Sequence, residues 1–533
     1  MLSDSARRLT GVAATDRILF IAGALLVVLA AAPYPIFDLD RFFAPKELAL
    51  HVFALALALP ILRRAKALSL DPTDLALALY LLIGAASALL APDGWSAARA
   101  MAVSLSGAIL FWSARASDDG TRRAVVAAAA AAAVAAAAMC LVQAYGVRFA
   151  LFSPHRAPGG TLGNRNFVAH IAVVCAPALI LAVLRARRGG AAAGIAGAAL
   201  VSAALVLTRS RAALLGLAAG AAVLVYGFRR ARSPLDDGRT AFRLRSLLAA
   251  AALGALAALL LPNTLEWKSD SPYLDTIAGL ADYREGSGRG RIVQYSRSLR
   301  IAAAHPLLGA GPGNWAAVYP KFIRGFDPAI DYAIGRAVNP WPSSDWVAVL
   351  SERGLPTLAA LLAVFVLLFR GAWRRTANGG DEALEGCALA ATLASAAVVG
   401  CFDAFLLLPA PAFLLWSLAG ATAAASPAVW SVQLPPRAAR RLALAAALVM
   451  GAAVLRSSGQ IAAMSIYSKA RTRAQVARAA LLAPGDARIR SRLDALRKMT
   501  RPAAAPVPPP AATPSDTTDD TPEQPDASGL QNN

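Results

Sequence analysis

Two pairs of closely spaced arginines are candidates for anion binding. Arg209 and Arg211 are separated by one serine between two apolar runs, and Arg289 and Arg291 are separated by one glycine in a long polar segment. A guanidinium can bind a phosphate group through two parallel hydrogen bonds. These four arginines are therefore predicted to bind an anion, and a lipid pyrophosphate has the right charge and shape. The alternative is that they anchor the chain to lipid headgroups.

The elements that must position these arginines are membrane helices. Of the 533 residues, 57% are hydrophobic and only 16% are charged, which is not typical of a soluble enzyme. Apolar runs recur at lengths close to the roughly 20 residues that cross a bilayer core, where only a helix satisfies its own backbone. We expect thirteen spans, at about 18–35, 47–62, 73–91, 98–114, 124–145, 166–184, 191–208, 212–228, 246–261, 355–370, 383–401, 411–425 and 441–456.

Basic residues occupy alternate connections between these spans. The short connections on the opposite side, such as 91–97 and 402–410, contain no lysine or arginine. Positive loops stay in the cytoplasm, so the amino terminus is predicted to be cytoplasmic and the carboxyl terminus to lie outside. The net charge of +21 is thereby explained by topology, and no nucleic-acid partner is expected. The basic residues are Arg7, Arg8, Arg63, Arg64, Lys66, Arg115, Arg122, Arg123, Arg185, Arg187, Arg188, Arg229, Arg230, Arg232, Arg370, Arg374, Arg375, Arg437, Arg440 and Arg441.

This topology divides the chain into five regions. Residues 1–261 form a membrane region of about nine spans, and residues 262–345 form a large helical loop on the outer, periplasmic side. Residues 346–456 supply about four further spans. Residues 457–500 have the apolar spacing of a helical hairpin outside the membrane, and the Pro/Thr/Asp-rich residues 501–533 lack the apolar content needed to fold. The fold class is thus an all-α polytopic membrane protein with 12 or 13 transmembrane helices.

The outer loop contains a predicted helix and a predicted turn. The glycine-dense stretch 305–314 follows no strand, so a tight turn between two helices is favoured over a nucleotide-binding loop. A helix over about 289–304 would place Arg289, Arg297 and Arg300 in one sector, free to meet an anion. The opposite sector would carry the apolar residues Ile292, Tyr295, Leu299 and Ala303.

No metal site or disulfide is expected from the cysteines and histidines. Each of the four cysteines lies inside an apolar run, which is typical of small packing residues. The four histidines are too scattered along the chain to form a metal cluster. The residues concerned are Cys140, Cys175, Cys387, Cys401, His51, His155, His170 and His305.

The motifs in this order resemble the O-antigen ligase and polymerase superfamily, whose members are bacterial integral-membrane glycosyltransferases. The likeness extends from about residue 37 to residue 425, and the stretch from Arg289 to Asn314 is its most specific part. The other matching motifs are Phe37-Asp38 with Pro45-Lys46, the stretch from Gly160 to Asn166, Ser210-Arg211 with Leu215, and Phe402-Asp403 with Pro409.

The resemblance implies a reaction at the periplasmic face of the bacterial inner membrane. The donor would be a polyprenyl-pyrophosphate-linked glycan, and the acceptor a glycan, a lipid or a protein. No metal, nucleotide or other cofactor would be needed. Arginines would stabilise the departing pyrophosphate, which is the largest charge that develops in such a transfer.

The sequence departs from the resemblance at two residues of one pattern, and the last glycine of that pattern is Thr357 here. Ligases of this superfamily carry a histidine that would serve the acceptor hydroxyl, and the aligned position here is Ser343. Asp345, Glu352 or Asp403 could take over as general base. Asp345 is the first choice, because a carboxylate partly removed from water beside a span has a raised pKa. The alternative is that Asp345 only caps the helix that follows.

Three classes of function remain open. The first is a polysaccharide polymerase or ligase of cell-envelope glycans such as lipopolysaccharide, with polymerase preferred because of Ser343 and a protein O-oligosaccharyltransferase as a related option. The second is a catalytically degenerate relative that acts as a component of a polysaccharide assembly or export complex. The third is a transporter, which the alanine-rich, nearly uncharged spans disfavour.

Overall fold

The structure is a computed structural model, and the side chains discussed below all lie in the part of the chain that it describes. That part comprises residues 4–64, 68–154, 156–231, 238–267, 269–279, 286–327, 329–331, 336–337, 339–423 and 432–499. The expected tail at 501–533 lies outside the described residues.

A helix occupies each of the thirteen expected spans. Eleven of these helices are long and apolar enough to cross a membrane among the described residues, and α1 and α15 are the other two. The prediction of an all-helical polytopic membrane protein is therefore confirmed. The thirteen are α1 (Asp4–Leu29), α2 (Asp40–Arg64), α3 (Pro72–Leu89), α4 (Gly94–Arg115), α5 (Asp119–Ala144), α6 (Arg165–Arg185), α7 (Arg188–Thr208), α8 (Arg211–Arg230), α9 (Gly238–Leu260), α13 (Asp345–Arg375), α14 (Gly380–Phe402), α15 (Pro409–Ala423) and α16 (Pro436–Ser468).

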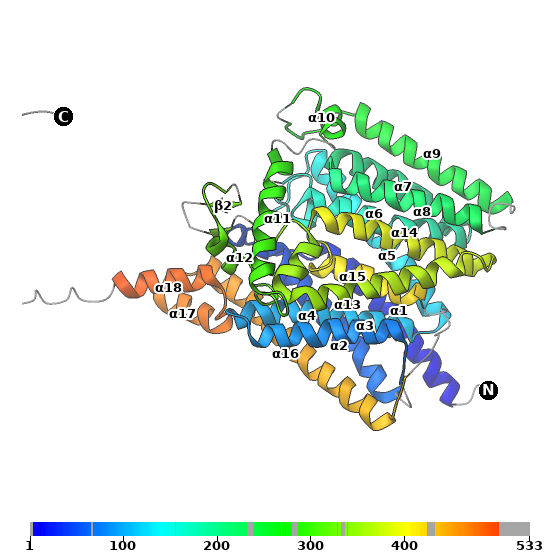
Figure 1. Cartoon of the computed structure of the whole chain (residues 1–533). Helices are drawn as coiled ribbons and strands as arrows, with labels where there is room; N and C mark the ends of the chain where they lie inside the picture. Colours follow the sequence, from blue (N-terminus) through cyan, green and yellow to red (C-terminus); the bar gives the residue numbers. More distant parts are fainter. Residues whose placement is uncertain are drawn as a thin grey trace, which may run out of the picture.

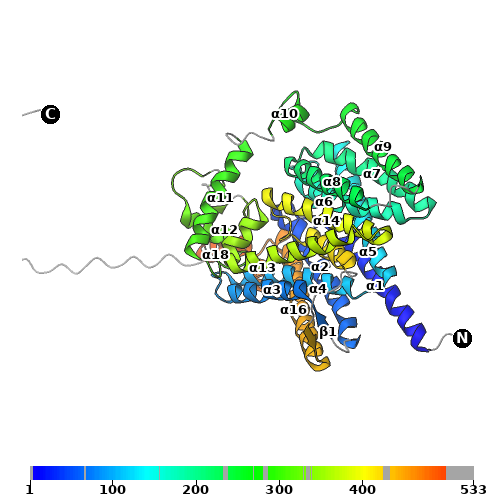
Figure 2. The ribbon, with the colours of Figure 1, turned by 45° about the vertical axis from the view of Figure 1, so that its right-hand side comes forward.

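The remaining helices gather at one end of the bundle. Figure 1 shows α10 (Pro272–Ala278), α11 (Gly286–Ala304), α12 (Trp315–Val318), α17 (Arg473–Leu482) and α18 (Ala487–Met499) at the end opposite the amino terminus, and Figure 2 agrees. We call this the loop end. Short 3₁₀ turns, η1 (Pro35–Phe37), η2 (Gly160–Leu162) and η3 (Tyr319–Phe322), complete it together with the strand pair β2 (Ile330–Asp331) and β3 (Arg336–Ala337).

The opposite end holds the basic connections. Arg185, after α6, forms ion pairs with Asp381 at 2.7 Å and Glu385 at 2.6 Å, and Glu385 also pairs with Arg375. The connections α6–α7 and α13–α14 thus lie together, as the charge pattern predicts. Here β1 (Leu68–Leu70) pairs with β4 (Val432–Leu434), which the helical periodicity does not predict.

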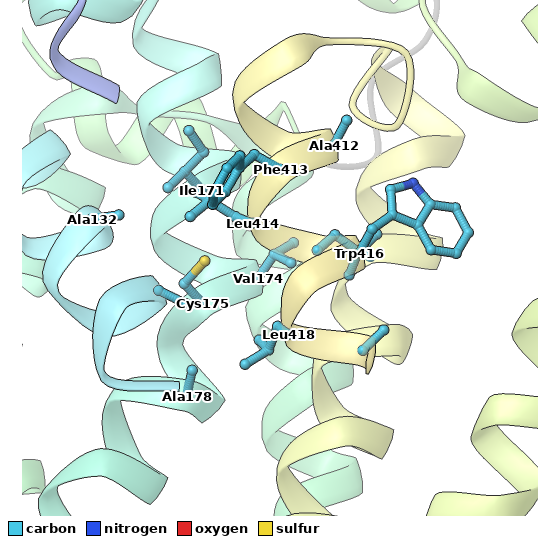
Figure 3. Close-up of a cluster of buried hydrophobic side chains, with 14 of the residues drawn as sticks. Ala132, Ile171, Val174, Cys175, Ala178, Ala412, Phe413, Leu414, Trp416 and Leu418 are labelled. Atoms are coloured by element: carbon cyan, nitrogen blue, oxygen red, sulfur yellow. The ribbon is translucent and has the colours of Figure 1, made fainter. Parts of the chain in front are cut away.

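The core is made of small and branched side chains packed at close range. Figure 3 shows Ile171, Val174 and Cys175 of α6 against Phe413 and Leu414 of α15. Alanines of α5 close the other side, because a methyl group lets two helix backbones approach closely. Consequently α6 is fixed along its length between α5, α14 and α15.

The four cysteines are free, and three of them are buried as expected of packing residues, whereas the fourth is not. Cys140, Cys175 and Cys387 are buried, whereas Cys401 is exposed at the end of α14. No disulfide therefore constrains the helices in the described part of the chain.

One long helix, α13, is bent at the loop end. Gly354 has φ +83°, and a Cβ there would lie 2.1 Å from the carbonyl oxygen of Leu307. Glycine is the residue that tolerates this conformation and this approach. The expected span at 355–370 begins directly after the bend, so residues 345–353 form a separate helical segment that contacts α11.

The carboxyl-terminal hairpin begins later than expected. Helix α16 continues without a break through 457–468, and only α17 and α18 form the pair. Tyr467 at the end of α16 packs edge-on against Phe37, with ring centroids 5.4 Å apart. The part of α16 beyond its apolar run is thus packed against η1.

Candidate functional site

The glycine-rich turn after α11 is folded against the first segment of α13. Gly309, Gly311 and Gly313 have φ values of +65°, +99° and +69°, which confirms the tight turn. The amide of Gly311 donates to the carbonyl of Glu352 at 2.8 Å. A Cβ at Gly309 would lie 2.2 Å from the backbone of Glu352, so no larger residue fits. The turn therefore fixes the distance between α11 and α13.

Glu352 holds this turn. Its side-chain oxygens accept the backbone N–H groups of Gly313 at 2.8 Å and Trp315 at 3.0 Å, and the residue is buried. Both oxygens are thus engaged with the chain itself. These contacts favour a positioning role for Glu352 over a direct contact with substrate.

Asp345 braces the connection between α14 and α15. It is fully buried, and its carboxylate accepts the backbone N–H groups of Phe405 and Leu406 at 2.9 to 3.0 Å. The N-cap of α13 is Ser344, whose hydroxyl accepts from Val347, so the interpretation of Asp345 as the cap is wrong. A carboxylate that accepts amides from another element fixes that element, and here it fixes the loop that carries Asp403.

Asp403 differs from the other two carboxylates because arginines face it. It follows α14 directly and is half-buried. Burial raises its pKa to about 6, although the positive charges of Arg291 and Arg156 and a hydrogen bond with Asn166 act in the opposite direction. Such a carboxyl group is ionised at neutral pH yet readily protonated, which suits a general base.

Ser343, the position of the absent family histidine, lies beside α11 and the end of α14. Its amide donates to Gln294 at 2.8 Å, and its carbonyl lies 2.5 Å from the hydroxyl of Tyr295. The same hydroxyl lies 2.8 Å from the carbonyl of Cys401, two residues before Asp403. Tyr295 thus joins the three elements at this point.

The faces of α11 differ in part from the expectation. Its buried side is formed by Gln294, Ser298 and Ile301, whereas Ile292 and Leu299 are 51% and 50% exposed. Arg297 is not free to meet an anion, because it donates to the carbonyl of Arg324 at 2.7 Å. Leu299 and Ile292 instead line an open groove together with Tyr295, Ser296, Arg300 and Ala303. Arg289 is exposed on the same helix.

A second group of cations lies where α7 turns into α8. Arg209, with φ +53°, places its guanidinium 4.7 Å from the ring centroid of Trp267, and Arg165 lies 5.1 Å from the same ring. Arg209 also donates to Thr276 of α10 at 2.9 Å. Arg211 donates to the carbonyl of Gly279 at 2.7 Å, so it ties α10 to the bundle.

The loop that carries Arg156 is held by the start of α2. Arg41 donates to the carbonyls of Ala150 and Phe152 at 3.0 and 2.7 Å. Lys46 is buried and donates to the carbonyl of Thr161 at 2.8 Å. These three hydrogen bonds fix the connection on both sides of Arg156.

Residues 196–362 match the family model of the O-antigen ligase (Wzy_C). This segment is an O-antigen ligase domain. The match confirms the resemblance over that range, which runs from α7 to the middle of α13. No curated protein matches the chain.

The O-antigen ligase domain contains most of the predicted site, but not all of it. Arg209, Arg211, Arg289, Arg291, Ser343, Asp345 and Glu352 fall inside the matched range. Asp403, Arg156 and Asn166 fall outside it, and in the fold Arg156, Asn166 and Arg291 all act on Asp403.

Sequence reasoning missed several members of this site. Arg156, Arg165, His170 and Trp267 did not stand out, because each is a single residue in a loop or an apolar run. One signal was present: Asn166 and His170 are four residues apart and share a face of α6. Within the described residues, no group of three or more histidines, cysteines or carboxylates could hold a metal ion.

Proposed function

We propose that this protein is a membrane glycosyltransferase that moves or polymerises glycan from a polyprenyl-pyrophosphate donor at the periplasmic face of the bacterial inner membrane. One observation carries the proposal: the matched segment holds Arg291 on α11, whose Tyr295 lies 2.8 Å from the Cys401 carbonyl two residues before Asp403, and the charge of Arg291 acts on Asp403, whose pKa is about 6. A cation for the leaving group and a base for the acceptor thus stand together at the loop end. O-antigen or exopolysaccharide polymerase and ligase are the two forms of this activity.

Arg291 serves the donor in this proposal. As the bond between the sugar C1 and the pyrophosphate oxygen breaks, negative charge grows on the departing pyrophosphate. A guanidinium already in place stabilises that charge without reorganisation. Arg209, Arg211 and Arg289 belong to the same end of the molecule and extend the positive potential along the path of an anionic substrate.

Asp403 serves the acceptor. Its ionised carboxylate takes the proton from the acceptor hydroxyl while the hydroxyl oxygen bonds to the sugar C1. The products are the extended glycan, the polyprenyl pyrophosphate and a protonated Asp403. Asp345 and Glu352, the other candidates for the base, act here by holding the chain: Asp345 holds the loop that carries Asp403, and Glu352 holds the glycine-rich turn after α11.

The test is transfer in proteoliposomes that contain the purified protein and a polyprenyl-pyrophosphate oligosaccharide. Arg291→Lys keeps the charge but loses the fork, and we expect the rate to fall about 100-fold. Asp403→Asn should cost a similar factor, on the order of 100 to 10,000. Arg300→Lys, on the exposed side of the same helix, is the matched control and should leave the rate unchanged. A ladder of products indicates a polymerase, and a single addition indicates a ligase.

Two results would overturn the proposal in different ways. If Arg291→Lys and Asp403→Asn both transfer glycan at the wild-type rate, the cluster is not the active site. If the folded wild-type protein transfers nothing, the alternative of a catalytically degenerate component of an assembly complex is favoured. Ser343 is the observation behind that alternative, since a serine cannot act as a base unaided.

A further inference from the structure

His170 is a buried polar side chain whose presence the packing does not explain. It lies on α6 one turn after Asn166, it is fully buried, and its ring centroid is 6.3 Å from that of Phe405. In the part of the chain that the structure describes, neither ring nitrogen has a hydrogen-bond partner. Leaving a buried polar atom unpaired is destabilising, because the atom loses its hydrogen bonds to water and gains none in the protein. An alanine, valine or phenylalanine, like the neighbours on α6, would avoid this cost.

Arg291 carries the complementary unpaired group. Its Nε is buried and also lacks a partner among the described residues. Its positive charge acts on both His170 and Asp403, so the guanidinium lies within electrostatic reach of the imidazole. A neutral imidazole has one acceptor nitrogen, and the guanidinium Nε carries one N–H donor. The two elements also meet: Tyr295, one turn after Arg291 on α11, lies 2.8 Å from the carbonyl of Cys401, and Phe405, four residues later, packs against His170. One unpaired buried donor and one unpaired buried acceptor therefore lie on elements that meet at the α14–α15 loop.

The two groups differ in their freedom to move. His170 precedes Ile171, a buried core residue of α6 that Figure 3 shows beside Phe413 and Leu414 of α15. Arg291 is only half-buried and stands in the first part of α11, with a long side chain. The histidine is thus the less mobile partner. A hydrogen bond between the two would require the side chain of Arg291 to rotate toward His170.

We propose that His170 is a positioning residue that orients Arg291 by accepting a hydrogen bond from its Nε–H when the donor binds. When the Arg291 Nε–H is bonded to His170 on α6, the two terminal guanidinium nitrogens point away from α6. They then form the fork that binds two phosphate oxygens. This inference rests on the proposed function and assigns His170 to the donor. It is therefore not a substitute for the histidine absent at position 343, which would serve the acceptor.

The decisive experiment is a double-mutant cycle between positions 170 and 291. His170→Phe keeps the size and removes the acceptor, and it should lower transfer about 10-fold or more, because a misaligned fork binds the transition state poorly. His170→Gln restores an acceptor oxygen and should recover much of that loss. In the Arg291→Lys background His170→Phe should have no further effect, because lysine has no Nε–H.

Two controls separate this role from a structural one. His51→Phe changes the other buried histidine, on α2, and should leave the transfer rate per folded protein unchanged. His170→Phe should not lower the melting temperature, since it removes two unpaired polar atoms from the core. An equal loss from His170→Phe in both arginine and lysine backgrounds, or no loss in the wild-type background, overturns the inference.

A binding measurement separates this inference from the proposed function. The affinity for a polyprenyl pyrophosphate without a glycan should fall with His170→Phe and recover with His170→Gln. If that pattern holds while the wild-type protein transfers no glycan, the enzymatic proposal fails and the role of His170 stands. If glycan transfer occurs and depends on Arg291 but binding and transfer ignore His170, the inference fails and the enzymatic proposal stands.

Discussion

At the scale of single residues, the three candidate carboxylates have different surroundings. Asp345 and Glu352 each accept two backbone N–H groups from a neighbouring loop, so their oxygens are engaged in holding the chain. Asp403 accepts one backbone N–H at 2.9 Å and otherwise meets Arg291, Arg156 and Asn166. Of the three, Asp403 is the carboxylate acted on by the charges of arginines from two other elements, Arg291 and Arg156.

The pH dependence of transfer follows from this environment. Burial raises the pKa of Asp403 to about 6, and a base must be ionised to accept a proton. The rate should therefore fall as the pH drops below about 6 and reach a plateau above it. The measurement is kcat/KM against pH between about 5 and about 8, with Asp403→Asn as the control that removes this limb. A wild-type profile that is flat across this range contradicts the assignment of Asp403.

At the scale of elements, α16 is anchored to α2 and α4 by a buried ion-pair network. Glu47 of α2 pairs with Arg456 of α16 at 3.0 Å and with Arg99 of α4 at 2.7 Å, and Arg99 also pairs with Asp40 at 3.0 Å. The side chain of Glu47 is only 6% exposed. The network sets where α16 leaves the bundle, and thus where α17 and α18 pack on Phe37.

Removing one partner should loosen this end of the molecule. We expect Arg456→Met to lower the free energy of unfolding by about 2 kcal/mol, because a charge-assisted hydrogen bond to a buried carboxylate is lost. Proteolysis within α17 and α18 should accelerate, measured by the cleavage rate in detergent. Arg440→Met, on the exposed start of the same helix, is the matched control and should change neither quantity. Equal cleavage rates in both variants would show that the network does not anchor the hairpin.

At the scale of the whole molecule, the bundle separates two ends with different chemistry. The basic connections and their ion pairs, such as that of Arg185 with Asp381, lie at the end of the amino terminus. The glycine-rich turn, α11 and the hairpin α17–α18 lie at the loop end. The orientation of these ends across the membrane remains our prediction from the charge pattern, which places the loop end in the periplasm.

Labelling of single cysteines tests this orientation. In a variant without the four native cysteines, Ser296→Cys on α11 and Ser491→Cys on α18 should react with a membrane-impermeant maleimide in intact spheroplasts. Asn378→Cys, exposed at the opposite end, should react only after permeabilisation. The reverse pattern would place the loop end in the cytoplasm and contradict glycan transfer at the periplasmic face.

The amino-acid sequence alone locates the membrane helices. Each expected span coincides with a helix, because a run of about 20 apolar residues can satisfy its backbone in a membrane only in that form. The turn at Gly309, Gly311 and Gly313 was predictable for a different local reason: glycine adopts the positive φ values of a tight turn without steric cost.

Tertiary structure alone decided which residues meet. Asp345 and Asp403 are both acidic residues at helix ends, and only the packing of α13 against the α14–α15 loop turns the first into a brace. The meeting of Arg156, His170, Arg291 and Asp403 depends on contacts between residues that are up to 247 positions apart, from 403 − 156 in the printed numbering. Hydropathy and spacing describe one segment at a time, whereas a site of this kind is defined by side-chain packing between segments.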